Sequence, residues 1–339
     1  MNKLVRLICL AICLLGLSSA ATVGSAASVG SAASDYAIGD TFSLTIMHTH
    51  DIHGNLDDIS RYANYVDDVQ RSVDNMLLLD GGDMFRRGEL EQFRGIMEAE
   101  IFNLMGYDAC VTGNHEFNVP ADEKDADDCN AMISDLAQAL DAPLLCANVT
   151  MKATGEYMEG VEPYTIVELD GVRIGIIGLT SMKPAEREMP EVADKDFLDA
   201  MDTLNRCIAE LEGRTDINIV LSHAGIVQDL ALMELGHTPD WSGYSYDIAA
   251  ILSADTHLMM PWPLFCYYGT DKGIPVFQHG GEQYNTLARL DLEFEVTAEG
   301  FKLVDHEGYV CDVSETEPDP AIDALIAEYR AEAEAEAAA

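Results

Sequence analysis

Residues 109–117 read Ala-Cys-Val-Thr-Gly-Asn-His-Glu-Phe, a short apolar run followed by an amide, an imidazole and a carboxylate. The apolar run is typical of a buried strand. Asn114 and His115, directly after it, carry oxygen and nitrogen atoms of the kinds that bind metal ions. If other strands of the same sheet end in similar residues on the same side, the sequence predicts a metal site at that edge.

Four further apolar runs end in residues of this type. Residues 42–47 lead to Asp51 and His53, 76–79 to Asp83, 217–221 to His223, and 248–252 to Asp255 and His257. In an extended segment, residues two apart point the same way, so each Asp-x-His pair can share one ion. A single histidine or aspartate after a strand usually has a structural role, but five such sites in one chain are not expected by chance. The pattern predicts a mixed Asp/His/Asn cluster large enough for two metals, and a hydrolytic reaction.

The charge of the chain excludes several classes of partner. Its 339 residues include 19 Lys+Arg and 60 Asp+Glu, a formal net charge of −41. Such a surface repels nucleic acid polymers and anionic membranes. We therefore expect a small-molecule ligand, no nucleic acid partner and a monomeric protein.

The N-terminal region reads as an export signal. Lys3 and Arg6 precede an apolar run at residues 7–17 that is too short for an ordinary membrane span, and small residues follow. We assign 1–27 to a signal peptide and 28–40 to a flexible linker, with cleavage after Ala20 or Ala33 as alternatives. The expected location is the periplasm, the cell surface or the medium, with membrane contact only through an uncleaved signal.

Six cysteines lie beyond the signal segment, at positions 110, 129, 146, 207, 266 and 311. An even number in an exported chain permits one or two disulfides. Cys110 and Cys146 fall in expected strands, where a buried thiol is equally compatible with the pattern.

The rest of the chain alternates between strands and helices. Helices are expected near 57–75, 89–105, 127–140 and 196–212, and strands near 144–149, 161–169, 172–177, 274–279, 287–295 and 301–304, with Asp170-Gly171 as a hairpin turn. This order predicts sheets that are covered by helices on their outer faces. We place one catalytic domain at 41–314 and an acidic Ala/Glu-rich helix and tail at 315–339.

Several motifs resemble those of the metallophosphoesterase (calcineurin-like) superfamily. They are His48-Thr49-His50-Asp51-Ile52-His53-Gly54, Gly82-Asp83, Gly113-Asn114-His115-Glu116-Phe117, Ser222-His223-Ala224-Gly225 and Ser253-Ala254-Asp255-Thr256-His257. The resemblance is strongest to the exported 5′-nucleotidase / 2′,3′-cyclic-nucleotide phosphodiesterase enzymes and covers about residues 41–327. It implies an α/β four-layer sandwich in which two mixed β-sheets pack face to face between helices.

The resemblance also implies roles for individual residues. Asp51, His53, Asp83 and His257 would hold one divalent ion, and Asp83, Asn114, His223 and Asp255 the other, with Asp83 and a hydroxide bridging them. Two such ions acidify water and stabilise the charge of in-line attack on a phosphoryl group. His115 would assist as a cation or general acid near the phosphoryl oxygen or leaving group.

Three positions depart from the family pattern. Asp255 replaces a histidine, which adds a negative charge and favours Mn²⁺, with Zn²⁺, Mg²⁺ or Fe as alternatives. Asn118 replaces the aspartate that usually orients the catalytic histidine, so it can supply a hydrogen bond but no charge. His50 replaces an asparagine and is either a spectator or a substrate contact.

The two-domain nucleotidases also carry a C-terminal domain that clamps the base, and the sequence given ends after the linker helix. We therefore expect weak nucleoside selectivity. Arg86 and Arg87, close to Asp83, are either phosphate contacts or a solvated pair.

The predicted function is an exported phosphoric ester hydrolase of the 5′-nucleotidase type. It would hydrolyse nucleotides and other phosphomonoesters, or small phosphodiesters, with two divalent ions and His115. The alternatives are a degenerate, non-enzymatic metal-binding relative, or the same fold acting on nucleotide-sugar pyrophosphates or sulfur esters.

Overall fold

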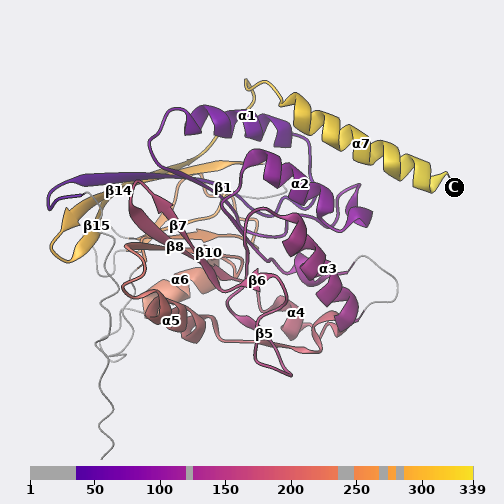
Figure 1. Ribbon diagram of the computed structural model, residues 1–339, viewed down its shortest axis with the longest axis horizontal. Coiled ribbons are helices and arrows are strands. Elements are labelled where there is room, and N and C mark those ends of the chain that lie inside the picture. Colours follow the sequence, from indigo (N-terminus) through magenta and orange to yellow (C-terminus); the bar gives the residue numbers. More distant parts are fainter. Residues whose placement is uncertain (1–35, 120–124, 236–247, 267–273, 280–285, 339) are drawn as a thin grey trace, which may run out of the picture. The chain divides into compact units, whose positions relative to one another are not determined.

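The computed structural model describes residues 36–119, 125–235, 248–266, 274–279 and 286–338 (Figure 1). The expected signal peptide at 1–27 and most of the linker at 28–40 lie outside these ranges, so both stay predictions. No helix among the described residues is long and apolar enough to cross a membrane.

The first sheet has seven strands in the order β15-β14-β1-β2-β3-β4-β6. Their bounds are β1 Thr41–Thr49, β2 Met76–Asp80, β3 Ala109–Val111, β4 Leu144–Leu145, β6 Val161–Glu162, β14 Ala288–Thr297 and β15 Gly300–Val310. Strands β1, β2, β3, β4 and β6 are parallel, whereas β14 and β15 add an antiparallel edge. Because the carboxyl ends of β1, β2 and β3 meet at one edge, the loops after them converge.

The second sheet has six strands in the order β12-β13-β11-β10-β8-β7. They are β7 Tyr164–Leu169, β8 Val172–Leu179, β10 Ile217–Ser222, β11 Ala250–Ser253, β12 Leu264–Cys266 and β13 Ile274–Phe277. Strands β8, β10, β11 and β13 are parallel, and β7 and β12 pair antiparallel at the edges. A separate antiparallel pair joins β5 (Val149–Met151) to β9 (Lys195–Phe197).

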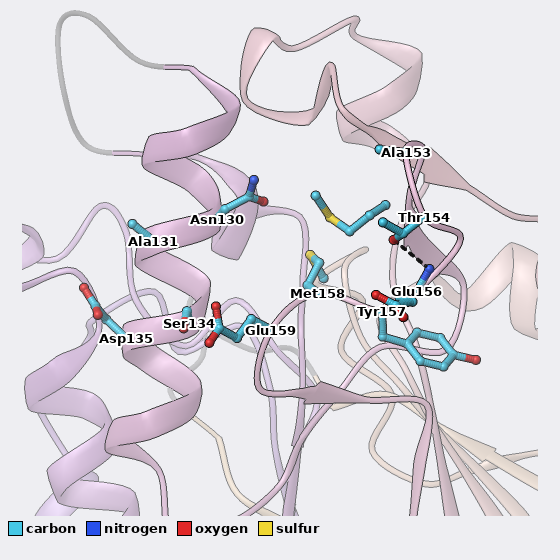
Figure 2. Close-up of a pocket in the computed structure, with 11 residues that line it drawn as sticks. Asn130, Ala131, Ser134, Asp135, Ala153, Thr154, Glu156, Tyr157, Met158 and Glu159 are labelled. Atoms are coloured by element: carbon cyan, nitrogen blue, oxygen red, sulfur yellow. Dashed lines mark hydrogen bonds between the residues drawn. The ribbon is translucent and has the colours of Figure 1, made fainter.

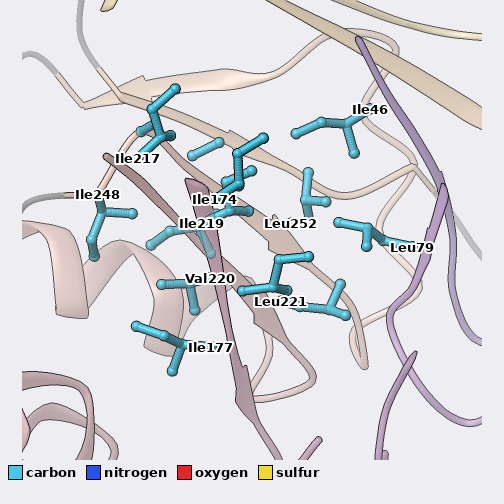
Figure 3. Close-up of a cluster of buried hydrophobic side chains, with 14 of the residues drawn as sticks. Ile46, Leu79, Ile174, Ile177, Ile217, Ile219, Val220, Leu221, Ile248 and Leu252 are labelled. Carbon is cyan, nitrogen blue, oxygen red and sulfur yellow. The ribbon is translucent and has the colours of Figure 1, made fainter. Parts of the chain in front are cut away.

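The core follows from the two-residue period of the strands. In β2, Leu77 and Leu79 belong to the cluster between the two sheets, whereas Leu78 belongs to the cluster under the helices. Figure 3 shows Ile46 and Leu79 of the first sheet facing Leu221 and other aliphatic side chains of the second. Burying both faces of the first sheet requires helices outside it.

Those helices form the outer layers. α1 (Ile59–Gln70), α2 (Ile96–Met105), α3 (Ala126–Ala139) and α7 (Pro320–Ala337) share the cluster on the outer face of the first sheet. α5 (Ala200–Leu211) packs on β8, and α6 (Ile226–Leu235) packs on β11, β12 and β13. Figure 1 shows α1 and α7 on one side of the sheets and α5 and α6 on the other. The predicted sandwich of two mixed sheets flanked by helices is confirmed.

Some element boundaries differ from the sequence expectation. The strand expected at 144–149 is two strands, β4 and β5, that belong to different sheets, and the helix expected from 196 begins at Ala200 because Lys195–Phe197 pairs as β9. The helix expected near 89–105 begins only at Ile96, and Glu91–Phe93 forms a separate 3-10 turn before it. α4 (Lys183–Glu186), α6, β12 and the 3-10 turns His115–Phe117 and Pro190–Val192 were not predicted. Within the expected C-terminal helix and tail, α7 is continuous from Pro320 to Ala337.

The described cysteines form no disulfide with one another. Cys110, Cys129, Cys146, Cys207 and Cys311 are buried free thiols, and the side chain of Cys266 lies outside the described part of the chain. For Cys110 and Cys146, the structure therefore agrees with the alternative of buried free thiols.

Candidate metal centre and active site

The loops after five parallel strands meet where the carboxyl edges of the two sheets come together. Asp51, Asp83 and Asn114 follow β1, β2 and β3, whereas His223 and Asp255 follow β10 and β11. Two hydrogen bonds join the sheets here. Nδ1 of His223 contacts the carbonyl oxygen of Gly81 at 2.5 Å, and the backbone N–H of Asp255 donates to Oδ2 of Asp51 at 2.8 Å.

The side chains form three overlapping groups of possible metal ligands. These groups are Asp51, His53 and His257; His53, Asp83 and His115; and Asp51, Asp83 and His223, with the ligating atoms of each group within 4.8 Å of one another. Nε2 of His257 lies 3.3 Å from Oδ1 of Asp51, and Nε2 of His223 lies 3.2 Å from Oδ2 of Asp83. The structure thus brings together six of the residues singled out from the sequence.

The buried polar atoms at the centre fit divalent cations. Oδ1 of Asp51 and Nε2 of His223 are buried and make no hydrogen bond of normal geometry within the described part of the chain. Burial alone would raise the pKa of Asp51, but His223, His257 and His50 outweigh burial and hold that pKa well below its ordinary value. A buried carboxylate oxygen ringed by imidazoles is a donor set that fits a divalent cation.

The titration of His223 points the same way. Burial alone would lower its pKa, but Asp83 and Asp51 outweigh burial and hold the pKa of His223 well above its ordinary value. The carboxylates therefore draw positive charge onto this imidazole, and a metal ion that binds there would displace the proton.

Backbone strain is concentrated in the same residues. Asp51, His53, Asp83, Asp255 and His257 all have positive φ, between 50° and 75°. Non-glycine residues rarely adopt this conformation, and it tends to gather at functional sites. Packing of the two sheets holds these loops in place so that the side chains face one another.

Two glycines let the loops approach closely. A Cβ at Gly113 would lie 2.2 Å from Oδ1 of Asp83, and a Cβ at Gly82, where φ is +87°, would lie 2.5 Å from the backbone nitrogen of Gly113. Any larger residue at either position would displace the Asp83 carboxylate or the turn that carries it.

Glu116 braces these turns from below. Its fully buried carboxylate accepts hydrogen bonds from the backbone N–H groups of Asp83, Met84 and Gly113, at 2.9, 3.0 and 2.6 Å. Burial, with Asp83 nearby, raises the pKa of Glu116 to about 7. Its role is to position Asp83 and the 113–115 turn.

His50 is a partner of Asp51 and is 1% exposed, so it is not at the surface. Its Nε2 accepts from the backbone N–H of His279 at 3.1 Å, which leaves the proton on Nδ1. Nδ1 therefore donates to Oδ2 of Asp51 at 2.6 Å. Since Oδ2 is occupied by His50 and the N–H of Asp255, Oδ1 is the oxygen that remains for an ion.

His115 lies at the rim of the centre, half-buried. Its backbone N–H donates to Oδ1 of Asp83 at 2.7 Å, and its Nε2 contacts Nη2 of Arg87 at 2.9 Å. Burial, with Arg87 and Arg86 nearby, lowers the pKa of His115 despite the opposing effect of Asp83. The positive charge beside the centre is therefore on Arg87, not on the imidazole.

Asn118 does not contact His115. Its Oδ1 accepts from Nε and Nη2 of Arg86 at 3.2 and 2.9 Å, and its Nδ2 lies 3.4 Å from Oε1 of Glu191. Asn118 is placed to orient Arg86, which also pairs with Glu91 at 3.0 Å. From the sequence, we expected Asn118 to bond His115. In the structure its amide oxygen is instead turned towards the guanidinium of Arg86.

Lys183 is a site residue that the sequence motifs did not indicate. Its Nζ lies 2.5 Å from Oδ1 of Asp255. Lys183 follows β8 in a segment with no recognisable motif, and 72 residues separate it from Asp255. Only a through-space contact identifies it.

Of two cavities, one adjoins the metal centre and the other is separate from it. One of about 240 Å³ is lined by Lys183 and Asp255, beside the centre. A larger one of about 540 Å³ lies between α3 and residues 151–159, and Figure 2 shows Asn130, Glu156 and Glu159 around it. No residue of the metal centre lines the larger cavity.

Comparison with known proteins agrees with this geometry. The calcineurin-like phosphoesterase family matches residues 44–259. The trifunctional nucleotide phosphoesterase protein YfkN of Bacillus subtilis is 31% identical over 217 residues, which cover 56% of this chain and 15% of that protein. A probable 5′-nucleotidase of Treponema pallidum is 31% identical over 248 residues, or 67% of this chain and 38% of the relative. The chain thus spans well under half the length of these relatives.

Solved structures show the same fold. A 5′-nucleotidase precursor from Thermus thermophilus superposes with a TM-score of 0.73 at 22% identity, covering 87% of this chain and 59% of that one. The calcineurin-like phosphoesterase YfkN from Bacillus subtilis superposes with a TM-score of 0.68 at 23% identity, covering 86% and 98%. With a family match over more than half its residues and a cluster of candidate metal ligands at the expected edge, the chain belongs to the calcineurin-like phosphoesterase family.

Proposed function

We propose that the chain is a phosphoric ester hydrolase of the 5′-nucleotidase type that binds two divalent metal ions. Its substrates would be nucleotides and other phosphomonoesters, or small phosphodiesters. The observation that carries this proposal is the convergence of Asp51, Asp83 and His223 from both sheets. At this point Oδ1 of Asp51 and Nε2 of His223 are buried without a hydrogen bond of normal geometry among the described residues. The 5′-nucleotidases among the relatives support the substrate class.

The residues divide into two ligand sets that share Asp83. Asp51, His53, Asp83 and His257 would hold one ion, and Asp83, Asn114, His223 and Asp255 would hold the other. Bound divalent ions lower the pKa of water and withdraw charge from phosphoryl oxygens. Carboxylate and amide oxygens mixed with imidazoles suit Mn²⁺, Mg²⁺ or Fe as well as Zn²⁺, and Mn²⁺ is our first choice.

The residues around the ions would position the substrate. Arg87 places a guanidinium beside His115, where it can bind a phosphoryl oxygen in a forked geometry. His115, whose Nε2 accepts from Arg87, orients that group and would assist the reaction at the rim. Asn118 holds Arg86, so its contribution to catalysis is to position a second guanidinium.

We also propose that the chain is exported, because Lys3, Arg6 and the apolar residues 7–17 form a signal-like start. We expect a monomer that acts on small molecules.

The test is metal content and turnover of the purified chain. Mn²⁺ should bind at two ions per chain and support hydrolysis of nitrophenyl phosphate. Asp83→Asn should lower turnover by more than the roughly 10- to 100-fold loss that is typical of a residue outside the ligand set. Asp135→Asn, in the distant cavity, is the charge-matched control. A metal-free wild-type protein that stays silent with added Mn²⁺ would instead identify a non-enzymatic relative.

A substrate panel separates the remaining alternatives. We would compare the rates of hydrolysis of AMP, 2′,3′-cyclic AMP, UDP-glucose and a bis-nitrophenyl diester. Monoesters and small diesters should be hydrolysed faster than the pyrophosphate. Preference for UDP-glucose would contradict the proposed substrate class while keeping the metal chemistry.

A further inference from the structure

The contact between Lys183 and Asp255 lies at the edge of the second ligand set. Nζ and Oδ1 are 2.5 Å apart, and the two side chains are 39% and 5% exposed. The carboxylate is thus enclosed in the protein, whereas the ammonium reaches solvent. An ion pair of this kind holds its carboxylate in place without locking the lysine in the interior.

The oxygen that Lys183 holds is also the one that faces the second ligand set. Oδ1 of Asp255 lies 3.8 Å from Nε2 of His223. The other oxygen, Oδ2, faces Gly225, where a Cβ would lie 3.1 Å away. Asp255 belongs to none of the three close groups of ligating atoms found among the described residues.

We propose that Lys183 is a positioning residue that competes with the second divalent ion for Oδ1 of Asp255. The inference rests on the proposed function, in which Asp83, Asn114, His223 and Asp255 hold that ion. With Lys183 in place, the extra negative charge at position 255 is neutralised and the second ion meets a weaker site. Metal binding is then stepwise, and the second step requires Lys183 to release the carboxylate.

The adjoining cavity offers space for the Lys183 ammonium once it leaves Asp255. The cavity of about 240 Å³ that Lys183 and Asp255 line is also lined by Glu186 and Asp199. Both acids reach solvent, so they can accept the ammonium in a hydrated pair once an ion has displaced it. The exchange therefore leaves no buried charge without a partner.

Calorimetric titration of the metal-free full chain with Mn²⁺ tests the proposal at fixed pH and salt. Wild type should bind in two steps. Lys183→Met should tighten the weaker step by about five- to tenfold, because removing a partly exposed ion pair frees the carboxylate. Lys183→Arg keeps the charge and should restore the wild-type affinity. The stronger step should not change.

Two further variants separate this mechanism from general charge effects. Lys152→Met removes the same charge from an exposed lysine that bonds the carbonyl oxygen of Ala193, and should leave both steps unchanged. In an Asp255→Asn background, Lys183→Met should no longer tighten the weaker step. Equal tightening by Lys152→Met, or an effect of Lys183→Met that persists without Asp255, would overturn the proposal.

The result also separates this inference from the proposed function. Two-step binding that Lys183→Met leaves unchanged or weakens would overturn the inference alone. Wild type and variants that bind no Mn²⁺ would overturn both.

Discussion

At the residue scale, His50 shows how a side chain outside the ligand set can determine what a ligand does. Its tautomer is set by the N–H of His279, and its own N–H occupies one oxygen of Asp51. The other oxygen of Asp51 is left facing the imidazoles. Partners of this kind orient metal ligands, and their loss typically lowers metal affinity or activity by one to two orders of magnitude.

We therefore predict that His50→Ala weakens Mn²⁺ binding by roughly 10- to 100-fold. Equilibrium dialysis of the wild-type and variant chains measures it. His306→Ala, on β15, is the control and should bind Mn²⁺ like wild type. An unchanged affinity for His50→Ala would mean that the N–H of Asp255 alone suffices to orient Asp51.

At the element scale, α7 is an integral part of the helical layer that covers the first sheet. Ile322 and Ile326 are 1% and 4% exposed, within the cluster that also contains residues of α1 and α2. The helix begins at Pro320 with Asp319 as its N-cap, and the N–H of Asp319 donates to the carbonyl oxygen of Ser60 at 2.9 Å. The acidic Ala/Glu composition of the tail conceals this packing.

We predict that Ile322→Ala and Ile326→Ala each lower the free energy of unfolding by about 2–4 kcal/mol, because each leaves a cavity between α7 and its neighbours. Urea denaturation measures the loss. Glu328→Ala, on the exposed side of the same helix, should change stability little. A loss for Glu328→Ala as large as the losses for the two isoleucine variants would show that packing of Ile322 and Ile326 is not responsible.

At the scale of the whole molecule, charge opposes folding. With 60 acidic and 19 basic residues, the folded chain brings many like charges close together. Salt screens these charges, and the screening length falls from about 10 Å at 0.1 M to about 3 Å at 1 M.

We therefore predict that the melting temperature, measured with EDTA so that metal binding does not contribute, rises by at least about 2 °C from 0.1 to 1 M NaCl. Differential scanning calorimetry measures it. A falling melting temperature would show that favourable ion pairs, such as that of Arg173 with Asp216, outweigh the general repulsion.

Much of the layer structure was readable from local pattern. The alternation of Leu77, Leu78 and Leu79 between two cores is visible as a buried run, and the helical spacing of Ile59, Tyr62 and Val66 as one apolar face. Short elements were not predicted, because a segment of three or four residues is too short to show a helical or strand periodicity. Residues 144–149 read as one strand, but β4 and β5 pair in different sheets, which depends on partners distant in sequence.

The sequence by itself determined the strand-end motifs, and with them the fold class and the candidate ligands, because those depend on residue type and short spacing. Only the tertiary structure decided which partners each side chain meets. His50 bonds Asp51 but depends on His279, 229 residues away, and Lys183 reaches Asp255 across 72 residues. Asn118 turns to Arg86, where sequence reasoning placed it beside His115. Hydrogen bonds and ion pairs of this kind depend on where two sheets bring distant loops together, and no local pattern encodes that meeting.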